Sequence, residues 1–297
     1  MSFLQNTRVG GALSAFDHTS HRWVATPLRG PHPSSSRPAD ARAVGKQTLS
    51  LTSWNIQASH WSSRPVARSE LIVDHILKGP KLPDIILLQE VVSSVRESLL
   101  SDPRVRSSFL TTDAEDDTAF KLKGVPFATM TLLSRKRFGS PLLAEEEEGE
   151  RGSKMVLDSV FRMKLNSWYK RDALCVNIAA PSAPGTVLRL FNVHLDSFPR
   201  PARRMHQMME LAYLLREPGC SGGIAAAGRR LVALHGPDGG ATWGVGVELE
   251  DGLKPCRLDK VLMLGLQPDE IEVLHPGLID AHTPWSDHCG LRCTFTI

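Results

Sequence analysis

The sequence lacks any apolar run close to the roughly 20 residues that a membrane-spanning helix requires, and its N-terminus lacks the apolar stretch of a secretory signal. It contains no internal repeat, which excludes solenoids and propellers. The charge is nearly balanced, since 35 Lys and Arg residues against 32 Asp and Glu residues leave a net charge of +3. That balance does not by itself indicate nucleic acid. We therefore expect a soluble protein with no membrane contact, whose function must be inferred from particular residues.

Cysteine is scarce and shows no Cys-x-x-Cys spacing. The five cysteines are an odd set: Cys175, Cys220, Cys256, Cys289 and Cys293. This pattern indicates neither a disulfide framework nor a zinc knuckle. A reducing intracellular compartment fits it best.

The length and composition favour one large folded domain after an N-terminal tail. The chain has 297 residues, of which 41% are hydrophobic, enough for a single two-layer core. Residues 24–46 are rich in proline, serine and arginine, a composition that cannot bury enough apolar surface to offset chain entropy. We predict that residues 1–46 form a disordered tail and that the folded domain covers residues 47–297.

Hydrophobic periodicity predicts many strands with interspersed helices, and hence an α/β layered domain. Helices are predicted over 66–78, 93–100 and 202–216, the last with Met205, Met208 and Met209 on its core side. Strands are predicted from 47 to about 56 and over 84–91, 127–133, 156–165, 173–178, 187–193, 223–227, 257–263, 271–274 and 291–297.

Two of these strands end in polar residues suited to a metal and a phosphate. Asn55 closes the strand that begins near Gln47, and its amide could bind a phosphate oxygen or a metal-bound water. Glu90 ends a continuous apolar strand, and magnesium prefers one or two such carboxylates together with substrate phosphate. The alternatives are an asparagine that starts a turn and a glutamate that caps the surface.

A third strand carries a row of polar side chains. Asn192, His194 and Asp196 alternate with apolar residues, so strand geometry predicts that they share one face. Burying such a row without partners would cost several kcal/mol by order of magnitude, so an ordinary core strand rarely contains one. The row indicates either a site or an exposed edge.

The C-terminal third of the chain contains further candidates. Asp287 can orient His288, which can then transfer a proton or bind a phosphate oxygen, although such a pair also occurs as a loop cap. Arg257 and Asp259 are expected on one face, where a structural ion pair is the favoured interpretation. Trp243 lies in a glycine-rich loop, where it could stack on a base but more often packs in a core.

The candidate residues lie in six short motifs, which follow one another along the chain as Ser53-Trp54-Asn55-Ile56, Leu88-Gln89-Glu90-Val91, Asn192-Val193-His194-Leu195-Asp196-Ser197, Thr242-Trp243, Arg257-Leu258-Asp259 and Ser286-Asp287-His288. In this order, the motifs resemble those of the endonuclease/exonuclease/phosphatase superfamily. Each is weak alone, but their fixed order makes a chance match improbable. Within the superfamily the sequence most resembles the tyrosyl-DNA phosphodiesterases, which release tyrosine adducts from DNA 5′ ends. The resemblance implies a DNase I-like, four-layer α/β sandwich of two mixed β-sheets flanked by helices.

The resemblance also implies a metal, a set of site residues and a substrate. Glu90 would be the main ligand of Mg²⁺, or of Mn²⁺, with Asn55 supporting both the metal and the phosphate. The residues implied in catalysis are His194, Asp287 and His288, and those implied in substrate or phosphate binding are Asn55, Asp196, Ser197 and Trp243. The implied substrate is a DNA 5′ end or a tyrosyl-DNA adduct, acted on by a monomer in the nucleus or cytoplasm.

One family motif is missing. A Gly-Asp-x-Asn segment, whose Asp aligns the attacking water, normally follows a Gly-Gly-Ile strand. Here residues 222–226 lead instead into Ala227-Gly228-Arg229-Arg230-Leu231, as if a block had been deleted near 228–231. Losing a water-positioning group costs orders of magnitude in rate. We expect impaired turnover and a strand at 223–227 that is partly uncovered.

Three alternatives remain open. The chain could be a non-catalytic relative that binds phosphate or nucleic acid. It could be a phosphatase or sphingomyelinase-type member of the same superfamily, since one metal centre serves all these substrates. It could also be the product of a defective transcript or gene model.

Overall fold

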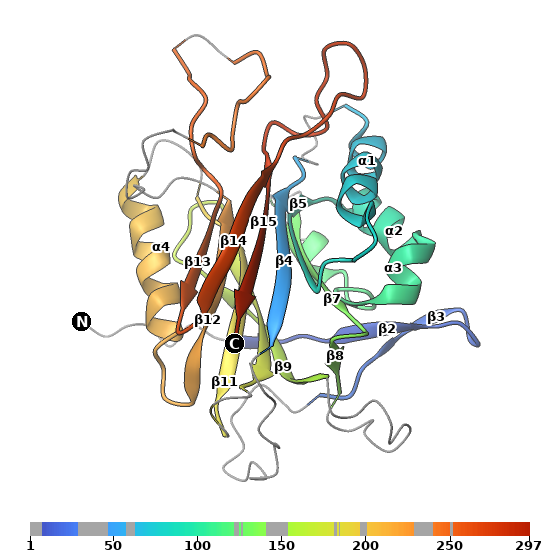
Figure 1. Cartoon of the computed structure of the whole chain (residues 1–297), viewed down its shortest axis with the longest axis vertical. Helices are drawn as coiled ribbons and strands as arrows, with labels where there is room; N and C mark the ends of the chain where they lie inside the picture. Colours follow the sequence, from blue (N-terminus) through green and yellow to red (C-terminus); the bar gives the residue numbers. More distant parts are fainter. Residues whose placement is uncertain are drawn as a thin grey trace.

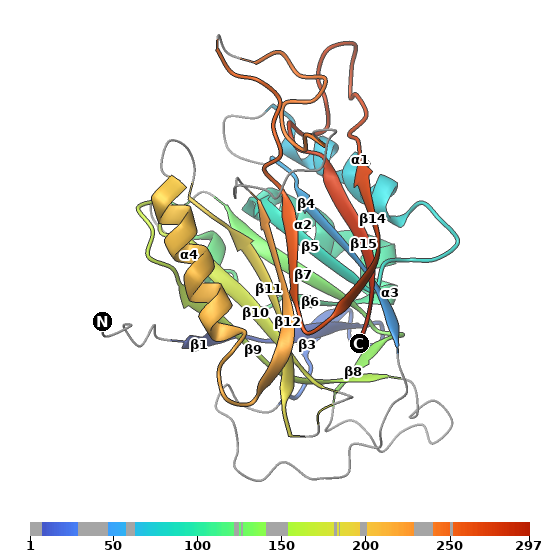
Figure 2. The same ribbon diagram turned by 60° about the vertical axis from the view of Figure 1, so that its left-hand side comes forward.

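The structure is a computed structural model that describes residues 8–28, 47–57, 63–121, 125, 127–140, 154–180, 183, 185–196, 201–228, 240–249 and 252–297. Two mixed β-sheets pack against each other, and helices cover their outer faces (Figures 1 and 2). No helix in these ranges is long and apolar enough to cross a membrane.

One sheet has the order β1-β9-β10-β11-β12-β13, with β8 paired to β9 outside this path. Its strands are β1 (Arg8–Gly10), β8 (Phe138–Gly139), β9 (Met155–Lys164), β10 (Asp172–Ala179), β11 (Val187–His194), β12 (Cys220–Gly228) and β13 (Lys260–Leu264). β11 and β12 are parallel, whereas β9, β10 and β11 form an antiparallel meander.

The other sheet has the order β14-β15-β4-β5-β7-β6-β2-β3. Its strands are β2 (Leu13–Asp17), β3 (Arg22–Ala25), β4 (Thr48–Asn55), β5 (Ile85–Val91), β6 (Phe109–Thr112), β7 (Ala128–Ser134), β14 (Gln267–Leu274) and β15 (Gly290–Thr296). The central strands β4 and β5 are parallel, so their carboxyl ends lie at the same edge of the sheet.

Alternating side chains divide the core into layers. On β5, Ile85 and Leu87 face the other sheet, whereas Ile86 and Leu88 face the helices. Those helices are α1 (Pro65–Leu77), α2 (Ser93–Ser101) and α3 (Pro103–Ser108), and a 3₁₀ turn, η1, covers Thr118–Phe120. On the opposite side, α4 (Pro201–Leu214) packs on β9 to β12 through Met208 and Leu211. The predicted four-layer sandwich is confirmed, with a buried core between the sheets.

The prediction that residues 1–46 are disordered is wrong for residues 8–28. β1 pairs with β9, and β2 pairs with β6 and β3. Leu13 is fully buried and Phe16 is only 5% exposed. Strands of three to five residues are too short to show a clear hydrophobic periodicity, so the sequence did not reveal them. β1 and β2 are stabilised by partner strands that are distant in sequence. The rest of the predicted tail lies outside the described residues.

Two smaller expectations are also wrong. Of the three methionines on α4, only Met208 is buried, while Met205 and Met209 are 46% and 57% exposed. The buried face of the helix also contains Arg204, Gln207 and Leu211. The strand predicted over 223–227 is not uncovered at its centre. Residues 224–226 are at most 1% exposed, since β12 lies between β11 and β13 and is covered on both faces.

Candidate active site

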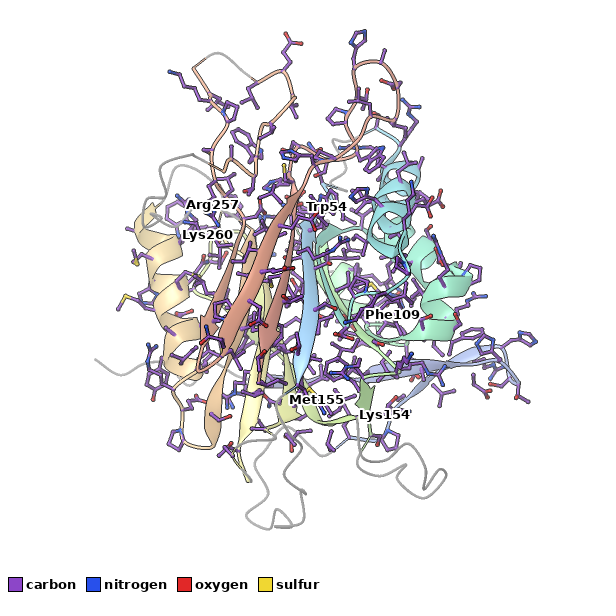
Figure 3. All side chains as sticks on the ribbon, in the orientation of Figure 1. Trp54, Phe109, Lys154, Met155, Arg257 and Lys260 are labelled. Atoms are coloured by element: carbon purple, nitrogen blue, oxygen red, sulfur yellow. The ribbon has the colours of Figure 1, made fainter. Side chains whose placement is uncertain are left out.

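The candidate site lies where β4 and β5 end side by side. Asn55 is the last residue of β4 and pairs with Gln89 of β5. The Nδ2 atom of Asn55 donates to Oε1 of Glu90 at 3.0 Å. Both side chains are buried, Asn55 completely and Glu90 at 8% exposure. Trp54, next to Asn55, and Arg257 lie toward one end of the sandwich, opposite Lys154 and Met155 (Figure 3).

The backbone of Glu90 has an uncommon conformation. Its φ angle is 58°, in the left-handed region that a side chain with a Cβ seldom adopts. The register between β5 and β7 shifts between Leu88 and Val91, as at a β-bulge. Such a conformation costs on the order of 1–3 kcal/mol and persists where the surroundings enforce it, typically at functional sites. The bulge directs the carboxylate toward Asn55 instead of into the alternating core pattern.

His194 brings the second sheet into the site. It is the last residue of β11, and its Nε2 lies 3.5 Å from Oε1 of Glu90. Phe127 flanks the imidazole, with 5.4 Å between ring centroids. Because Glu90 and His194 belong to different sheets, the site forms only when the sandwich closes.

His288 completes the cluster. Its Nδ1 lies 2.8 Å from Oδ2 of Asp259, and its Nε2 lies 3.4 Å from Nδ2 of Asn55. Burial lowers the pKa of His288, but the bond and charge of Asp259, with the charges of Asp287 and Glu90, raise the pKa above its usual value. When protonated, the imidazole donates from Nδ1 to Asp259 and from Nε2 to an acceptor in the site.

Asp259 is a site residue that the sequence interpretation missed. Arg257 is exposed, whereas Asp259 is 5% exposed and contacts His288. The backbone amides of Leu258 and Asp259 donate to Oγ1 of Thr242, which fixes this segment. The expected ion pair between Arg257 and Asp259 is therefore wrong. The only signal was the Arg-Leu-Asp motif itself, because nothing local places Asp259 beside a histidine 29 residues later.

Asp287 and Trp243 lie together at the rim of the cluster. Nε1 of Trp243 donates to Oδ2 of Asp287 at 2.8 Å, and Oδ1 of Asp287 lies 3.9 Å from Nε2 of His288. Trp243 is 9% exposed. The indole therefore holds the carboxylate in place and leaves Oδ1 directed toward His288.

Two residues that the sequence did not single out support this rim. Oε1 of Gln57 accepts hydrogen bonds from Nη2 of Arg68 and from the amide of Asp287, the latter at 3.0 Å. Nε of Arg68 also donates to the carbonyl of Trp285. Burial lowers the pKa of Arg68 below its usual value, and the charges of Asp287 and Glu90 partly offset this effect. A cation thus lies near two of the predicted site carboxylates.

The predicted row of Asn192, His194 and Asp196 is divided among three roles. Asn192 bridges the two sheets, since its Oδ1 accepts from Gln89 and its Nδ2 donates to the carbonyls of Leu88 and Met130. Only His194 contacts Glu90. Asp196 is fully buried, and its carboxylate accepts hydrogen bonds from Ser167 and from the amide of Trp168. Ser197 lies outside the described residues.

The donor set is suitable for a magnesium ion. Among the described residues, no lysine or arginine forms an ion pair with the buried carboxylate of Glu90. Oδ1 of Asp287 is buried and has no hydrogen-bond partner among the described residues. The described ranges contain no group of three His, Cys, Asp or Glu residues that could hold a metal by themselves. A site with one or two carboxylates fits an ion that keeps its waters and binds substrate phosphate.

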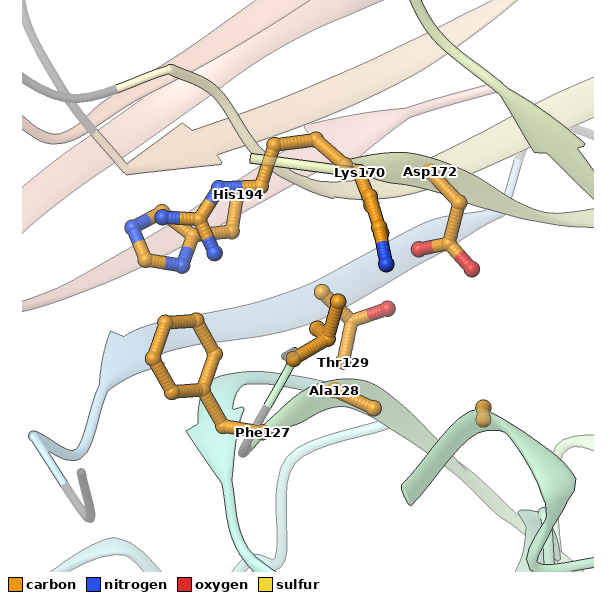
Figure 4. Close-up of a pocket in the computed structure, with 9 residues that line it drawn as sticks. Phe127, Ala128, Thr129, Lys170, Asp172 and His194 are labelled. Carbon is orange, nitrogen blue, oxygen red and sulfur yellow. The ribbon is translucent and has the colours of Figure 1, made fainter. Parts of the chain in front are cut away.

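A small pocket adjoins His194. Its lining comes from η1, the segment leading into β7, the turn that enters β10 and the end of β11: Ala119, Val125, Phe127, Ala128, Thr129, Lys170, Arg171, Asp172 and His194. Figure 4 shows His194 and Phe127 at one end of the pocket and Asp172 at the other. The guanidinium of Arg171 lies over the Phe127 ring, 4.8 Å from its centroid. An apolar ring and a cation thus lie beside the imidazole.

The end of β12 is the place where the resemblance to the superfamily predicts a Gly-Asp-x-Asn motif. Gly228 pairs with His194, so β12 ends next to the site. The sequence there is Arg229-Arg230-Leu231, without Asp or Asn. Residues 229–239 lie outside the described part of the chain.

The fold is similar to those of solved TDP2 and endonuclease/exonuclease/phosphatase structures. TDP2 from Caenorhabditis elegans is 20% identical, with 84% of this chain and 75% of that chain covered and a TM-score of 0.59. D. rerio TDP2 complexed with single-strand DNA product is 17% identical, with 84% and 98% covered and a TM-score of 0.61. The endonuclease/exonuclease/phosphatase from Bacteroides vulgatus is 12% identical, with 84% and 98% covered and a TM-score of 0.55. No protein-family model matches the sequence, and no curated protein matches it.

At these identities the similarity establishes the fold. The chain has the α/β sandwich of endonuclease/exonuclease/phosphatase structures, TDP2 among them. The predicted architecture is therefore confirmed by its neighbours as well as by its strand order.

Proposed function

We propose that this chain is a magnesium-dependent phosphodiesterase of the endonuclease/exonuclease/phosphatase superfamily, of the tyrosyl-DNA phosphodiesterase type, acting on DNA 5′ ends. The observation that carries the proposal is the buried group of Asn55, Glu90, His194, Asp259 and His288, drawn from both sheets. A carboxylate, an amide and two imidazoles are the groups that hold a hard cation and an anionic phosphate. The similarity to D. rerio TDP2, complexed with single-strand DNA product, supports DNA as the substrate.

Each residue in the group has a role in this proposal. Glu90 and Asn55 hold Mg²⁺, or Mn²⁺, which when bound polarises a phosphate oxygen as a Lewis acid. His194 binds the phosphate beside them. Asp259 fixes the orientation of His288, so that Nε2 can donate to a phosphate oxygen. Asp287, oriented by Trp243, completes the phosphate site. The bound cation and the two imidazoles would offset the negative charge that develops on the phosphate oxygens.

Turnover in this chain is proposed to be slow. The Asp and Asn of the Gly-Asp-x-Asn motif are missing after Gly228, and this strand end lies beside His194. Without them the attacking water lacks a group to align it, which costs orders of magnitude in rate. We propose that the protein acts in the nucleus or cytoplasm, because its proposed substrate is found there. We also propose that it acts as a monomer.

The test is a single-turnover assay with a 5′-tyrosyl oligonucleotide, enzyme in excess and MgCl₂. We expect the 5′-phosphorylated strand to be released slowly. This release should be lost when the metal is chelated and in the Glu90→Gln variant. D. rerio TDP2, assayed beside it, gives the rate of a chain with this fold. If this chain releases the product as fast as D. rerio TDP2, its turnover is not impaired. If Glu90→Gln releases the product as fast as the wild type, Glu90 does not belong to the active site.

The second candidate is a non-catalytic relative that binds nucleic acid. The missing Asp and Asn favour it, because the residues described around Glu90 and His288 can still bind phosphate. Salt-sensitive binding of the oligonucleotide without any release, even at high enzyme concentration, would support it. Parallel assays with inositol phosphates and sphingomyelin test the phosphatase and sphingomyelinase alternatives.

A further inference from the structure

The turn between β9 and β10 exposes two aromatic rings. Trp168 and Tyr169 are 59% and 42% exposed. Trp168 is the most exposed tryptophan among the residues that the structure describes. A single exposed ring is ordinary on a protein surface. What distinguishes this pair is how firmly the turn is held and what lies next to it.

The buried carboxylate of Asp196 holds the turn. It accepts hydrogen bonds from Oγ of Ser167 and, at 3.3 Å, from the amide of Trp168. Oγ of Ser167 in turn accepts from the amide of Tyr169 at 3.0 Å. Asp196 is fully buried and lies two residues after His194, so the candidate site and the aromatic turn are tied to the same segment.

Arg203 of α4 supports Trp168 from one side. Its guanidinium carbon lies 4.6 Å from the centroid of the indole ring. Nη1 of Arg203 donates to Oδ1 of Asn166 at 3.1 Å, and its Nε lies 3.7 Å from Oδ2 of Asp196. The cation is thus fixed beneath one face of the ring. A ring held in this way loses little conformational entropy when a flat ligand stacks on it.

A continuous series of stacked groups connects the turn to the candidate site. The guanidinium carbon of Arg171 lies 5.5 Å from the Tyr169 centroid and 4.8 Å from that of Phe127. Phe127 in turn lies 5.4 Å from the imidazole of His194. Arg171 and Phe127 thus link the Tyr169 ring to the imidazole of His194, which fixes the turn close to the candidate site.

The charge of the turn favours an anionic ligand. Residues 164–171 contain Lys164, Lys170 and Arg171 and no carboxylate. Aromatic rings interleaved with cations are the arrangement that binds single-stranded nucleic acid, where bases stack on rings and phosphates meet cations. A membrane-binding surface would instead need a larger apolar face.

We propose that Trp168 and Tyr169 form a stacking platform for unpaired bases of a DNA strand whose 5′ phosphate lies at Glu90, His194 and His288. The direction of the strand rests on the function proposed above. The stacking itself does not, because it needs no hydrolysis. Asp196 and Arg203 are positioning residues in this proposal, since they hold the turn and the ring without facing the strand.

The test measures binding in EDTA by fluorescence anisotropy of two 3′-labelled oligonucleotides with the same 5′ phosphate. One is an oligothymidylate, and the other has the same backbone with abasic sugars. Trp168→Ala should bind the oligothymidylate about tenfold more weakly, as expected for the loss of one base–aromatic stack. Its binding of the abasic strand should remain unchanged.

Two further variants make the result specific. Trp168→Phe keeps a flat ring and should restore most of the affinity. Tyr213→Ala removes an exposed ring from the far end of α4, 56% exposed, and should bind both strands as the wild type does. The platform is refuted if the wild type does not prefer the base-containing strand, if Trp168→Ala keeps that preference, or if it loses affinity equally for both strands. A wild type that shows the preference but never releases tyrosine refutes the proposed hydrolysis alone.

Discussion

The Nδ1 atom of His288 lies 2.8 Å from Oδ2 of Asp259, and both side chains are buried. This contact joins the residue just before β13 to the loop before β15 and fixes one imidazole of the candidate site. Asp259 thereby has a role that its neighbour Arg257 does not share, although the two lie two residues apart.

The first prediction concerns this pair. Asp259→Asn keeps the shape but removes the charge facing His288, so it should lower the free energy of unfolding by about 1–3 kcal/mol. Arg257→Gln, at an exposed position, should change it by less than about 0.5 kcal/mol. Urea unfolding of the two variants measures both. Equal losses would favour the ion pair expected from the sequence.

The second prediction concerns metal binding at Glu90. Magnesium should raise the melting temperature of the wild type, because an ion that binds only the folded state stabilises it by mass action. Glu90→Gln should abolish that rise, since a neutral amide is a poorer ligand for a hard cation. Glu97→Gln, at an exposed position on α2, is the matched control and should keep the full rise. Thermal scans with and without MgCl₂ decide it, and a rise retained in Glu90→Gln would place the ion elsewhere.

The third prediction concerns the N-terminal strands. Leu13→Ala removes a fully buried side chain from the core between the sheets, and should cost about 2–5 kcal/mol of unfolding free energy. Val9→Ala, at 60% exposure on β1, should cost less than about 0.5 kcal/mol. Denaturant unfolding measures both changes. A wild-type midpoint for Leu13→Ala would mean that residues 8–28 are not part of the core.

The fourth prediction concerns pH. Burial raises the pKa of Glu217, but hydrogen bonds from Arg8 and Arg189, at 2.8 and 2.7 Å, and their charges lower it below its usual value. A lowered pKa in the folded state means that the stabilisation is complete above the unfolded pKa, about 4.3. It is lost as the pH falls through the lower folded pKa.

Glu217→Gln should therefore cost about 2 kcal/mol near pH 7, and the difference from wild type should shrink below about pH 4. Stability curves from pH 7 to pH 3 test this. The exposed pair of Arg292 and Glu272 offers a control, since Glu272→Gln should have little effect at any pH in this range. A deficit for Glu217→Gln that stays constant with pH would assign the effect to packing.

The sequence alone determined helices α1, α2 and α4, most of the strands and the strand-end residues of the candidate site, whereas the short helix α3 was not predicted. Continuous apolar runs such as 84–91 and the helical spacing of 66–78 are local signals, and the structure places β5 and α1 there. Asn55 and Glu90 were also within reach, because the carboxyl ends of two parallel strands meet at one edge.

Only the tertiary structure decided which polar residues meet. Strand alternation grouped Asn192, His194 and Asp196, yet each has a different set of contacts, because Asn192 bridges the sheets and Asp196 lies beyond the strand end. Asp259 and Leu13 acquire their roles from partners far along the chain, His288 and the opposite sheet. Periodicity reports which face of an element is buried, whereas these contacts depend on how two sheets stack, and no local pattern encodes that.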